Sequence, residues 1–312
     1  MNRVDPPYPE PEVLERIPWD DTGQPLAVTI GSWNIAVLGL DRATASRLGT
    51  RWGGFVREQR VSDPDLTLAC ADRRGGGGLG LGPWTEGEVY RLEGALVGGR
   101  PVVRSYNFCM APGVEGRGVW RLVLGGADQE PTERTVENAV RSLVSRLALQ
   151  AGGFALHGAG VRRDGQTWIY AGRSGAGKST AVALSSPCES LGDDFAVAVP
   201  ADGGWNTCAV PFDNSEQAPD HPVPGLLALG AILRLFHAEA GEDDQVEVPP
   251  AVLRAASLLN AVMLPGLFAD LGDTVLTNAG RFVEHGRFGH LRFHKDRNFL
   301  EPVRSFLASA GR

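Results

Sequence analysis

The sequence predicts an α/β protein in which a smaller, β-rich α+β domain precedes an α/β domain built around a glycine-rich phosphate-binding loop. Three observations indicate this fold class. The chain has 312 residues, of which 43% are hydrophobic, and this is enough for two cores of ordinary size. Residues 26–126 contain short apolar runs separated by turn residues, a pattern typical of antiparallel strands. Residues 152–200 alternate strand-like and helix-like segments around the loop.

The composition and charge of the chain limit the kinds of partner that the protein is expected to bind. The net charge is −7 and the pI is about 5.4, which argues against sequence-independent binding of nucleic acid or of an anionic membrane. The N-terminus has no apolar segment of the signal-peptide type, and the longest apolar stretch, residues 223–236, is short and contains Arg234. We therefore expect a cytoplasmic protein that binds neither nucleic acid nor membrane. Four cysteines without CxxC spacing are expected to be structural thiols of a reducing compartment: Cys70, Cys109, Cys188 and Cys208.

Residues 1–126 are predicted to contain an N-terminal arm, a set of strands and a glycine-rich loop. Residues 1–24 are rich in proline and acid and are expected to form a loosely ordered arm. Six apolar runs predict the strands of the first domain: residues 26–31, 33–40, 66–71, 89–97, 100–108 and 118–126. The glycine-rich tract at residues 73–83 lacks a lysine and a following helical pattern, so it is expected to be a flexible loop.

A helix is predicted over residues 132–150, because apolar residues recur there at helical spacing and Gly152-Gly153 follows as a stop signal. Its apolar face consists of Val136, Ala139, Val140, Leu143, Val144 and Leu147. This helix closes the first domain, which we expect to cover residues 25–150. The second domain then covers residues 151–312.

The second domain begins with two predicted strands, residues 154–163 and 166–172, that meet at the turn Arg163-Asp164-Gly165. The glycine-rich loop and a helix over residues 179–186 follow, and an apolar strand comes after Asp193-Asp194. Further along, residues 229–236 predict a strand and residues 249–264 a helix opened by proline. Residues 290–300 predict a last strand with a basic turn.

The loop Gly172-Arg173-Ser174-Gly175-Ala176-Gly177-Lys178-Ser179 is a complete GxxxxGK[ST] motif. Lys178 is one of only two lysines beside 28 arginines, and a compact ammonium reaches between β- and γ-phosphates where a planar guanidinium fits badly. The three glycines let backbone amides turn toward phosphate oxygens, and the following helix would present its N-terminus. Ser179 is placed to bind magnesium and Thr180 to reach the α-phosphate. The predicted ligands are ATP and Mg²⁺, bound by Gly172, Arg173, Ser174, Gly175, Ala176, Gly177, Lys178, Ser179 and Thr180.

Asp193 and Asp194 lie side by side at a turn that leads into an apolar strand. Phosphoryl transfer requires a carboxylate that holds magnesium and, when the acceptor is an alcohol, a second one that accepts the hydroxyl proton. Two adjacent acids downstream of a phosphate-binding loop can divide these roles.

The segments "LHGAG", "GRSGAGKS" and "LGDD" together resemble the catalytic domain of the HPr serine kinase/phosphorylase family, which is related in fold to the phosphoenolpyruvate carboxykinases. The resemblance covers residues 152–200 well and 201–312 loosely. It implies a P-loop kinase domain in which His157 borders the transfer site. It also implies that Asp193 is the general base, with Lys178 as a further catalytic residue, and that Asp194 and Ser179 hold the metal.

The chain departs from that family in two places. The Glu-bearing Arg-Gly-Leu-Gly signature is absent, and residues 210–227 stand where it is expected; Asp213 or Glu216 could supply a metal ligand there, although a solvated loop fits these residues better. The N-terminal domain also differs, so the phosphocarrier HPr is not the expected acceptor. A basic cluster near the C-terminus could steady the transferred phosphate or form a solvated turn: Arg292, His294, Lys295 and Arg297.

Together these features predict a kinase that transfers the γ-phosphate of ATP to a hydroxyl group. The expected acceptor is a serine in a peptide or small protein, for example a natural-product precursor peptide. A small-molecule kinase or carboxykinase-like enzyme, a nucleotide-sensing regulatory module and an ATPase remain alternatives. The choice of nucleotide and the formation of a homo-oligomer stay open.

Overall fold

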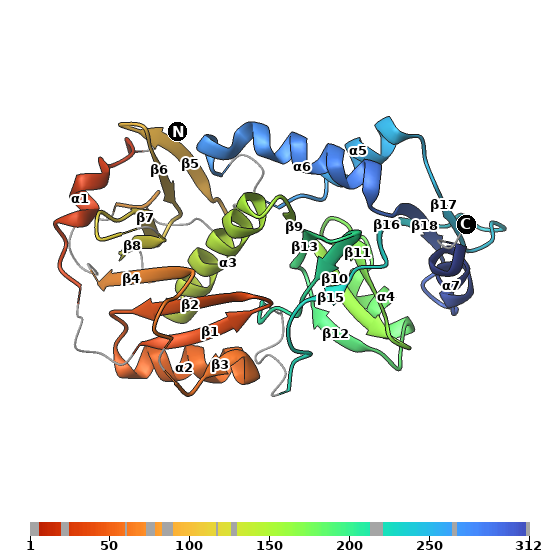
Figure 1. Cartoon of the computed structure of the whole chain (residues 1–312), viewed down its shortest axis with the longest axis horizontal. Helices are drawn as coiled ribbons and strands as arrows, with labels where there is room; N and C mark the ends of the chain where they lie inside the picture. The colour runs from red at the N-terminus through yellow and green to blue at the C-terminus, as the bar shows by residue number, and fades with distance from the viewer. Residues whose placement is uncertain are drawn as a thin grey trace. The chain divides into compact units, whose positions relative to one another are not determined.

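The computed structural model describes residues 6–19, 25–59, 61–72, 79–82, 90–116, 118–125, 130–212, 221–263 and 267–309. The chain is a mixed α/β protein, and its described strands form three sheets of eight, six and four strands (Figure 1). It divides into two compact units. Unit 1 comprises Met1–Val144 with Leu264–Gly272, and unit 2 comprises Ser145–Met263 with Asp273–Arg312. The division falls inside the helix α3 (Thr132–Gln150), which matches the helix expected from the sequence.

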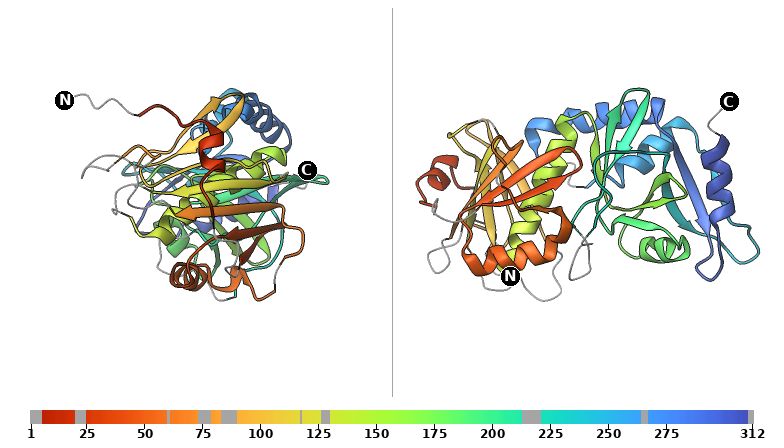
Figure 2. Two further views of the ribbon diagram at one scale, coloured as in Figure 1. Left: turned by 90° about the vertical axis from the view of Figure 1, so that its left-hand side faces the viewer. Right: turned by 60° about the horizontal axis from the view of Figure 1, so that its bottom comes forward.

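Unit 1 is built on the eight-stranded sheet, in the order β3-β1-β2-β4-β8-β7-β6-β5 (Figure 2, red to yellow). Its strands are β1 (Leu26–Ile30), β2 (Trp33–Leu38), β3 (Val56–Arg57), β4 (Leu66–Asp72), β5 (Glu93–Val97), β6 (Arg100–Arg104), β7 (Phe108–Pro112) and β8 (Val119–Leu124). The pairs β2–β4 and β4–β8 are parallel and the other described pairs are antiparallel. The prediction of a mostly antiparallel β domain is therefore confirmed, although β3 and β7 were not predicted as separate strands.

The N-terminal segment is more ordered than expected. Within the described residues 6–19, the helix α1 (Pro11–Glu15) contacts β7 and β8. Leu14 is 1% exposed and packs in a cluster with Val102, Cys109, Ala111 and Val123. Burial of one leucine side chain is worth about 1.5–3 kcal/mol. The prediction of a loosely ordered arm is thus wrong for these residues. The prediction rested on the proline- and acid-rich composition, which does not reveal that one apolar side chain, Leu14, packs in a buried cluster.

The helix α2 (Arg42–Trp52) was not predicted. Asp41 caps its N-terminus: the Thr44 amide donates to Asp41 Oδ1 at 2.9 Å and the Thr44 hydroxyl to Oδ2 at 2.7 Å. The 3₁₀ turn η1 (Gly53–Phe55) follows it. The apolar pattern of this segment is thin, but the buried Leu48 and Trp52 dock it on the domain. The helix therefore owes its stability to its cap and its packing.

Unit 1 also takes up a short segment from late in the chain. The 3₁₀ turn η2 (Ala269–Leu271) contacts β5 and β6, and the rings of Trp120 and Phe268 meet edge-on at 5.9 Å. A Cβ on Gly94 would lie only 1.7 Å from the Leu267 carbonyl oxygen. Glycine is therefore required where this segment crosses β5.

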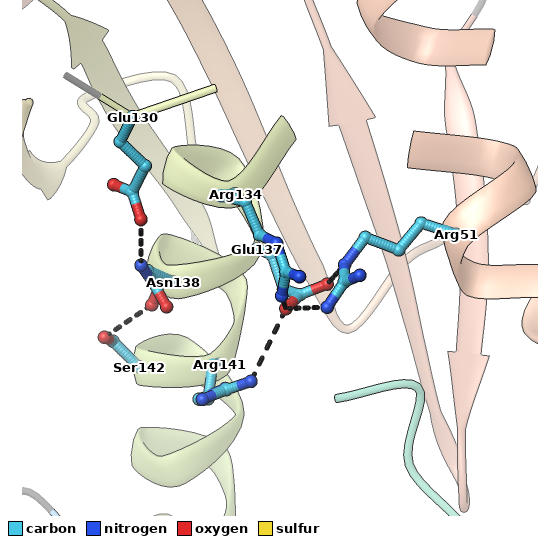
Figure 3. Close-up of polar contacts among 7 residues, drawn as sticks. All are labelled: Arg51, Glu130, Arg134, Glu137, Asn138, Arg141 and Ser142. Carbon is cyan, nitrogen blue, oxygen red and sulfur yellow. Dashed lines mark hydrogen bonds and ion pairs between the residues drawn. The ribbon is translucent and has the colours of Figure 1, made fainter. Parts of the chain in front are cut away.

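A buried carboxylate fastens α2 to α3 (Figure 3). Glu137 is 1% exposed, and its two carboxylate oxygens accept hydrogen bonds from Nε and Nη2 of Arg51. Arg134 and Arg141 lie 3.7 and 3.4 Å from Glu137 Oε1, one turn away on either side along α3. A bidentate pair of this kind carries geometric specificity as well as energy.

We expect Glu137→Gln to lower the free energy of unfolding by about 3–5 kcal/mol, because it deprives the buried Arg51 guanidinium of its carboxylate. The matched control is Glu133→Gln on the same helix, whose partner Arg47 is 53% exposed. That pair should contribute no more than about 1 kcal/mol. Urea unfolding followed by tryptophan fluorescence measures both variants. Equal stabilities of the two variants would contradict the role given to Glu137.

Unit 2 contains the six-stranded sheet, in the order β12-β10-β11-β16-β18-β17, and the four-stranded sheet, in the order β15-β14-β13-β9. Their strands are β9 (Phe154–Leu156), β10 (Gly158–Arg163), β11 (Gln166–Ala171), β12 (Glu189–Gly192), β13 (Ala196–Ala201), β14 (Gly204–Thr207), β15 (Leu227–Ala228), β16 (Ala231–His237), β17 (Gln245–Glu247) and β18 (Phe288–Phe293). The predicted hairpin turn is present between β10 and β11, with Arg163 opposite Gln166 and positive φ at Asp164 and Gly165. The pairs β11–β16 and β16–β18 are parallel.

The helices of unit 2 are α4 (Lys178–Leu184), α5 (Ala251–Leu259), α6 (Gly272–His285) and α7 (Leu300–Ala308). Side chains from α4 and α7 join those of β11, β16 and β18 in one apolar core, which includes Tyr170, Ala181, Leu233, Phe293 and Val303. Figure 1 shows α7 beside β17 and β18, and α7 contacts β17.

The C-terminal third differs from the sequence prediction in several elements. The last strand ends at Phe293 rather than at residue 300, where α7 begins, and α5 ends at Leu259. Both α6 and α7 were missed. Across the described part of the chain, no helix combines the length and the apolar character that a bilayer crossing requires.

Candidate phosphate-binding site

The loop 172–177 connects β11 to α4, in the strand–loop–helix order predicted from the sequence. Gly177 has φ of +94°, which favours glycine. A Cβ on Gly172 would lie 2.6 Å from the Ala176 Cβ, so the turn closes only without a side chain there. The conformation of the loop therefore requires glycine at both positions.

The main chain of the loop presents free donors. The Ala176 amide donates to the Arg173 carbonyl at 3.1 Å and closes the turn. Within the described residues, the amides of Ser174, Gly175 and Gly177 donate to no acceptor. Successive unpaired amides in a turn form a concave site for an anion. Because α4 has only seven residues, it is too short to have a long helix dipole. The electrostatic attraction for an anion therefore comes from these amides.

Lys178 is 6% exposed, and its ammonium group contacts three oxygens. Nζ donates to the carbonyl oxygens of Gly172 and Arg173 at 3.1 and 3.2 Å. It also lies 2.9 Å from Asp194 Oδ1. An ammonium has three donors, so all three are satisfied across the mouth of the loop. A bound phosphate can take the place of any of these acceptors.

The acid pair lies against the loop, as the sequence predicted, but its contacts divide the two acids differently. The Ser179 hydroxyl donates to Asp193 Oδ2 at 3.1 Å, whereas the family resemblance had grouped Ser179 with Asp194. Asp193 Oδ1 is buried and has no hydrogen-bond partner in the described part of the chain. Asp194 instead contacts Lys178 and His157, whose Nε2 lies 3.0 Å from Asp194 Oδ1.

Backbone geometry lets the two neighbouring carboxylates reach different partners. Asp194 has φ of +76°, a left-handed conformation that aspartate tolerates but that costs free energy. Burial alone would raise the pKa of Asp194, but the contacts from His157 and Lys178 outweigh burial and hold the pKa well below its usual range. Asp194 is therefore ionised throughout the physiological pH range.

His157 lies at the junction of β9 and β10 and is tied to the loop by its main chain. Its carbonyl accepts from the Gly172 amide at 3.0 Å, and its amide donates to the Ala261 carbonyl at 2.7 Å. Its buried Nε2 lies 3.0 Å from Asp194 Oδ1. The family resemblance pointed to His157, and the structure places its ring on the acid pair.

The donor set fits magnesium. Magnesium sites in phosphate-transferring proteins use one or two carboxylates together with phosphate oxygens and waters. Ser179 Oγ and the unpartnered Asp193 Oδ1 offer hard oxygen donors of this kind. The described residues contain no group of three or more His, Cys, Asp or Glu side chains able to hold a metal ion by themselves, so the bound phosphates would have to complete the coordination.

The basic cluster predicted near the C-terminus is divided by the structure. His294 Nδ1 and Arg297 Nε contact Asp244 at 2.8 and 2.9 Å, and Arg292 lies 3.6 Å from Glu247. Arg292 and Arg297 are thus each paired with an acid, and His294 shares the acid of Arg297. Lys295 is different, because its Cε lies 3.4 Å from the point where a Gly177 Cβ would stand.

Thr180 follows Ser179 in the first turn of α4 and is half-buried. Asp213 and Glu216 lie outside the described residues, as does most of the glycine-rich tract 73–83.

Sequence reasoning missed two residues beside the loop, Arg234 and His237, both on β16. The ring atom His237 Cε1 lies 3.5 Å from the same Cβ point of Gly177 as Lys295. The carboxyl ends of the parallel strands β11, β16 and β18 meet at one sheet edge, and ligands bind at such edges. Only the strand order, which the sequence does not reveal, brings β16 next to β11.

No family model matches the sequence, and no curated protein matches it either.

Proposed function

We propose that this chain is an ATP- and magnesium-dependent phosphotransferase that transfers the γ-phosphate to a hydroxyl group, with a serine of a peptide or small protein as the acceptor. One observation carries the proposal. Lys178 and Ser179, consecutive residues of the GxxxxGK[ST] motif at the start of α4, contact the consecutive acids Asp194 and Asp193. A cradle for phosphate and a pair of carboxylates thus share one site, as phosphoryl transfer requires.

Lys178 has the central role. Two carbonyls and one carboxylate hold its ammonium group at the mouth of the loop. On nucleotide binding it would exchange these acceptors for β- and γ-phosphate oxygens while the loop amides hold the phosphate chain. Donors that meet the developing charge of the transition state are each worth about 3–4 kcal/mol.

The contacts favour a division of roles between the acids. Ser179 and Asp193 would hold magnesium, which when bound would supply positive charge that offsets the charge of the phosphates. Asp194 would face the acceptor and its ionised carboxylate would orient the hydroxyl. Once Lys178 turns to the phosphates, one of the contacts that lower the pKa of Asp194 is removed, and the carboxylate can take the hydroxyl proton. The hydroxyl oxygen then forms a bond to the γ-phosphorus, the bond from that phosphorus to the β–γ bridging oxygen breaks, and ADP leaves with the electron pair.

His157 is assigned a positioning role in this scheme. Its ring holds Asp194 when Lys178 turns toward the phosphates, so the carboxylate keeps its direction. Charged groups oriented in advance lower the barrier without any reorganisation during the reaction.

The test is transfer of label from γ-phosphate-labelled ATP in the presence of magnesium. The purified chain is incubated with a serine-containing peptide library and, separately, with a set of small hydroxylated metabolites. We expect labelled peptide that co-migrates with phosphoserine after hydrolysis. Label on a small molecule alone would replace the peptide acceptor by a metabolite. Free phosphate alone would indicate an ATPase, and an absence of any product would indicate a nucleotide sensor.

A further inference from the structure

Arg234 occupies a position in unit 2 that ordinary structural roles do not explain. It lies in β16, opposite Ala171 of β11 on one side and His290 of β18 on the other. Residues in register across parallel strands extend from the same face of a sheet. Ala171 immediately precedes Gly172, so Arg234 lies at the level where the phosphate-binding loop begins.

The guanidinium of Arg234 has an unmet hydrogen-bonding requirement. Its Nη1 is buried and has no hydrogen-bond partner within the described residues. None of the ion pairs found in the described part of the chain includes Arg234, so no carboxylate there lies within 4.0 Å of it. A buried donor of a charged group left without a partner costs free energy, so such groups in proteins call for an explanation.

The neighbours of Arg234 add positive charge instead of neutralising it. Burial lowers the pKa of Arg234 below its usual value, and the charge of Arg173 in the loop lowers this pKa further. Arg173 is exposed and takes no part in any ion pair among the described residues. The two guanidinium groups therefore interact as like charges, neither is paired with an acid among the described residues, and an anion can stabilise such a pair.

The other side chains on this face do not supply the missing partner. His290 shares a hydrogen bond of 2.9 Å between its Nε2 and Ser257 Oγ, and burial, as the main cause, lowers its pKa. An imidazole provides no negative counter-charge. Glu247, opposite His290 in β17, is 46% exposed and pairs with Arg292 at 3.6 Å.

We propose that Arg234, together with Arg173, forms a second oxyanion subsite that binds a phosphate group held against the phosphate-binding loop. The guanidinium fork offers two parallel donors to phosphate oxygens, which satisfies the buried Nη1 and separates the two like charges. The phosphate is either the terminal phosphate of the nucleotide or the phosphate that the acceptor carries once it has been phosphorylated. This inference rests on the proposed function only for the identity of the ligand that the loop binds. The evidence that Arg234 requires an anion does not depend on the proposed function.

The test is isothermal titration of the full-length chain, as wild type and as Arg234→Gln, with three ligands: MgATP, MgADP, and inorganic phosphate added to MgATP-saturated protein. Glutamine keeps much of the length and polarity and removes the charge. Loss of hydrogen bonds to a charged group is expected to weaken binding about tenfold to a hundredfold. Arg162→Gln is the matched control, because Arg162 lies in β10 away from the loop and pairs with Glu189 at 3.3 Å.

The outcomes separate the two sources of phosphate. Weaker binding of MgATP with unchanged MgADP supports the subsite and assigns it to the terminal phosphate of the nucleotide. Unchanged nucleotide affinities with weaker binding of inorganic phosphate support it and assign it to the acceptor side. Equal affinities of wild type and Arg234→Gln for all three ligands overturn the proposal. Equal weakening of MgATP and MgADP also overturns it, because Arg234 would then act on phosphates that the loop itself holds.

Folding is checked by thermal denaturation without ligand. Arg234→Gln should melt at or above the wild-type temperature, because it removes a half-buried charge that a like charge repels. If this variant does not fold, Arg234→Lys, which keeps the charge but loses the fork, takes its place. The wild type is also titrated with inorganic phosphate alone. If phosphate binds and its binding depends on Arg234, the subsite is supported even when no nucleotide binds. Failure to bind nucleotide would then contradict only the proposed function. If wild type binds none of the ligands, both are overturned.

Discussion

Lys178→Met is expected to lose phosphotransfer by at least about a hundredfold, since a donor that meets transition-state charge contributes about 3–4 kcal/mol. The loop would keep its glycines and its amides, so nucleotide binding should weaken less than turnover. Single-turnover transfer from labelled ATP measures the effect.

A structural effect can be separated from a catalytic one, because Lys178 pairs with Asp194. Removing the lysine leaves a carboxylate that is only 25% exposed beside His157, and breaking such a pair is destabilising. The double variant Lys178→Met/Asp194→Asn removes both charges and should regain stability toward urea without regaining activity. Near-normal turnover of the folded single variant would contradict the role of Lys178.

Asp193→Asn and Asp194→Asn are expected to be about a hundredfold or more slower than wild type, but for different reasons. The contact of Ser179 with Asp193 places Asp193 on the magnesium side. Asp193→Asn should therefore raise the magnesium concentration needed for half-maximal activity and for ATP binding. Asp194→Asn should leave the magnesium requirement near the wild-type value and lower the maximal rate.

The two variants control for each other, because each replaces one acid of the same pair by its isosteric amide. Titration of activity and of ATP binding with magnesium measures both. The reverse pattern, with the magnesium requirement raised only in Asp194→Asn, would restore the assignment that the family resemblance suggested. No change of magnesium requirement in either variant would remove both acids from the metal site.

Much of this arrangement could be predicted from local signals. The loop was readable because glycine, lysine and serine occur at fixed spacing, and α3 because its apolar residues keep a helical period over 19 residues. Asp193 and Asp194 were found because acids of this kind must accompany such a loop. Each of these signals lies within one short segment.

The features that were missed depend on contacts between distant segments. α2 is held by its cap at Asp41 and by Arg51, whose partner Glu137 lies 86 residues away. Arg234 looked like a charge interrupting an apolar strand, and only the pairing of β16 with β11 brings it beside the loop. The division of roles between the two acids depends on the left-handed φ of Asp194. This backbone conformation cannot be predicted from the sequence.

Calorimetric titration of the full-length chain with ATP at millimolar magnesium tests the central claim most directly, because every catalytic role given to Lys178 and to the two acids presupposes a bound triphosphate. We expect saturable binding with one nucleotide per chain, weaker without magnesium and weaker in Lys178→Met. Absence of binding by either ATP or GTP under these conditions would contradict the claim that the loop is a nucleotide site.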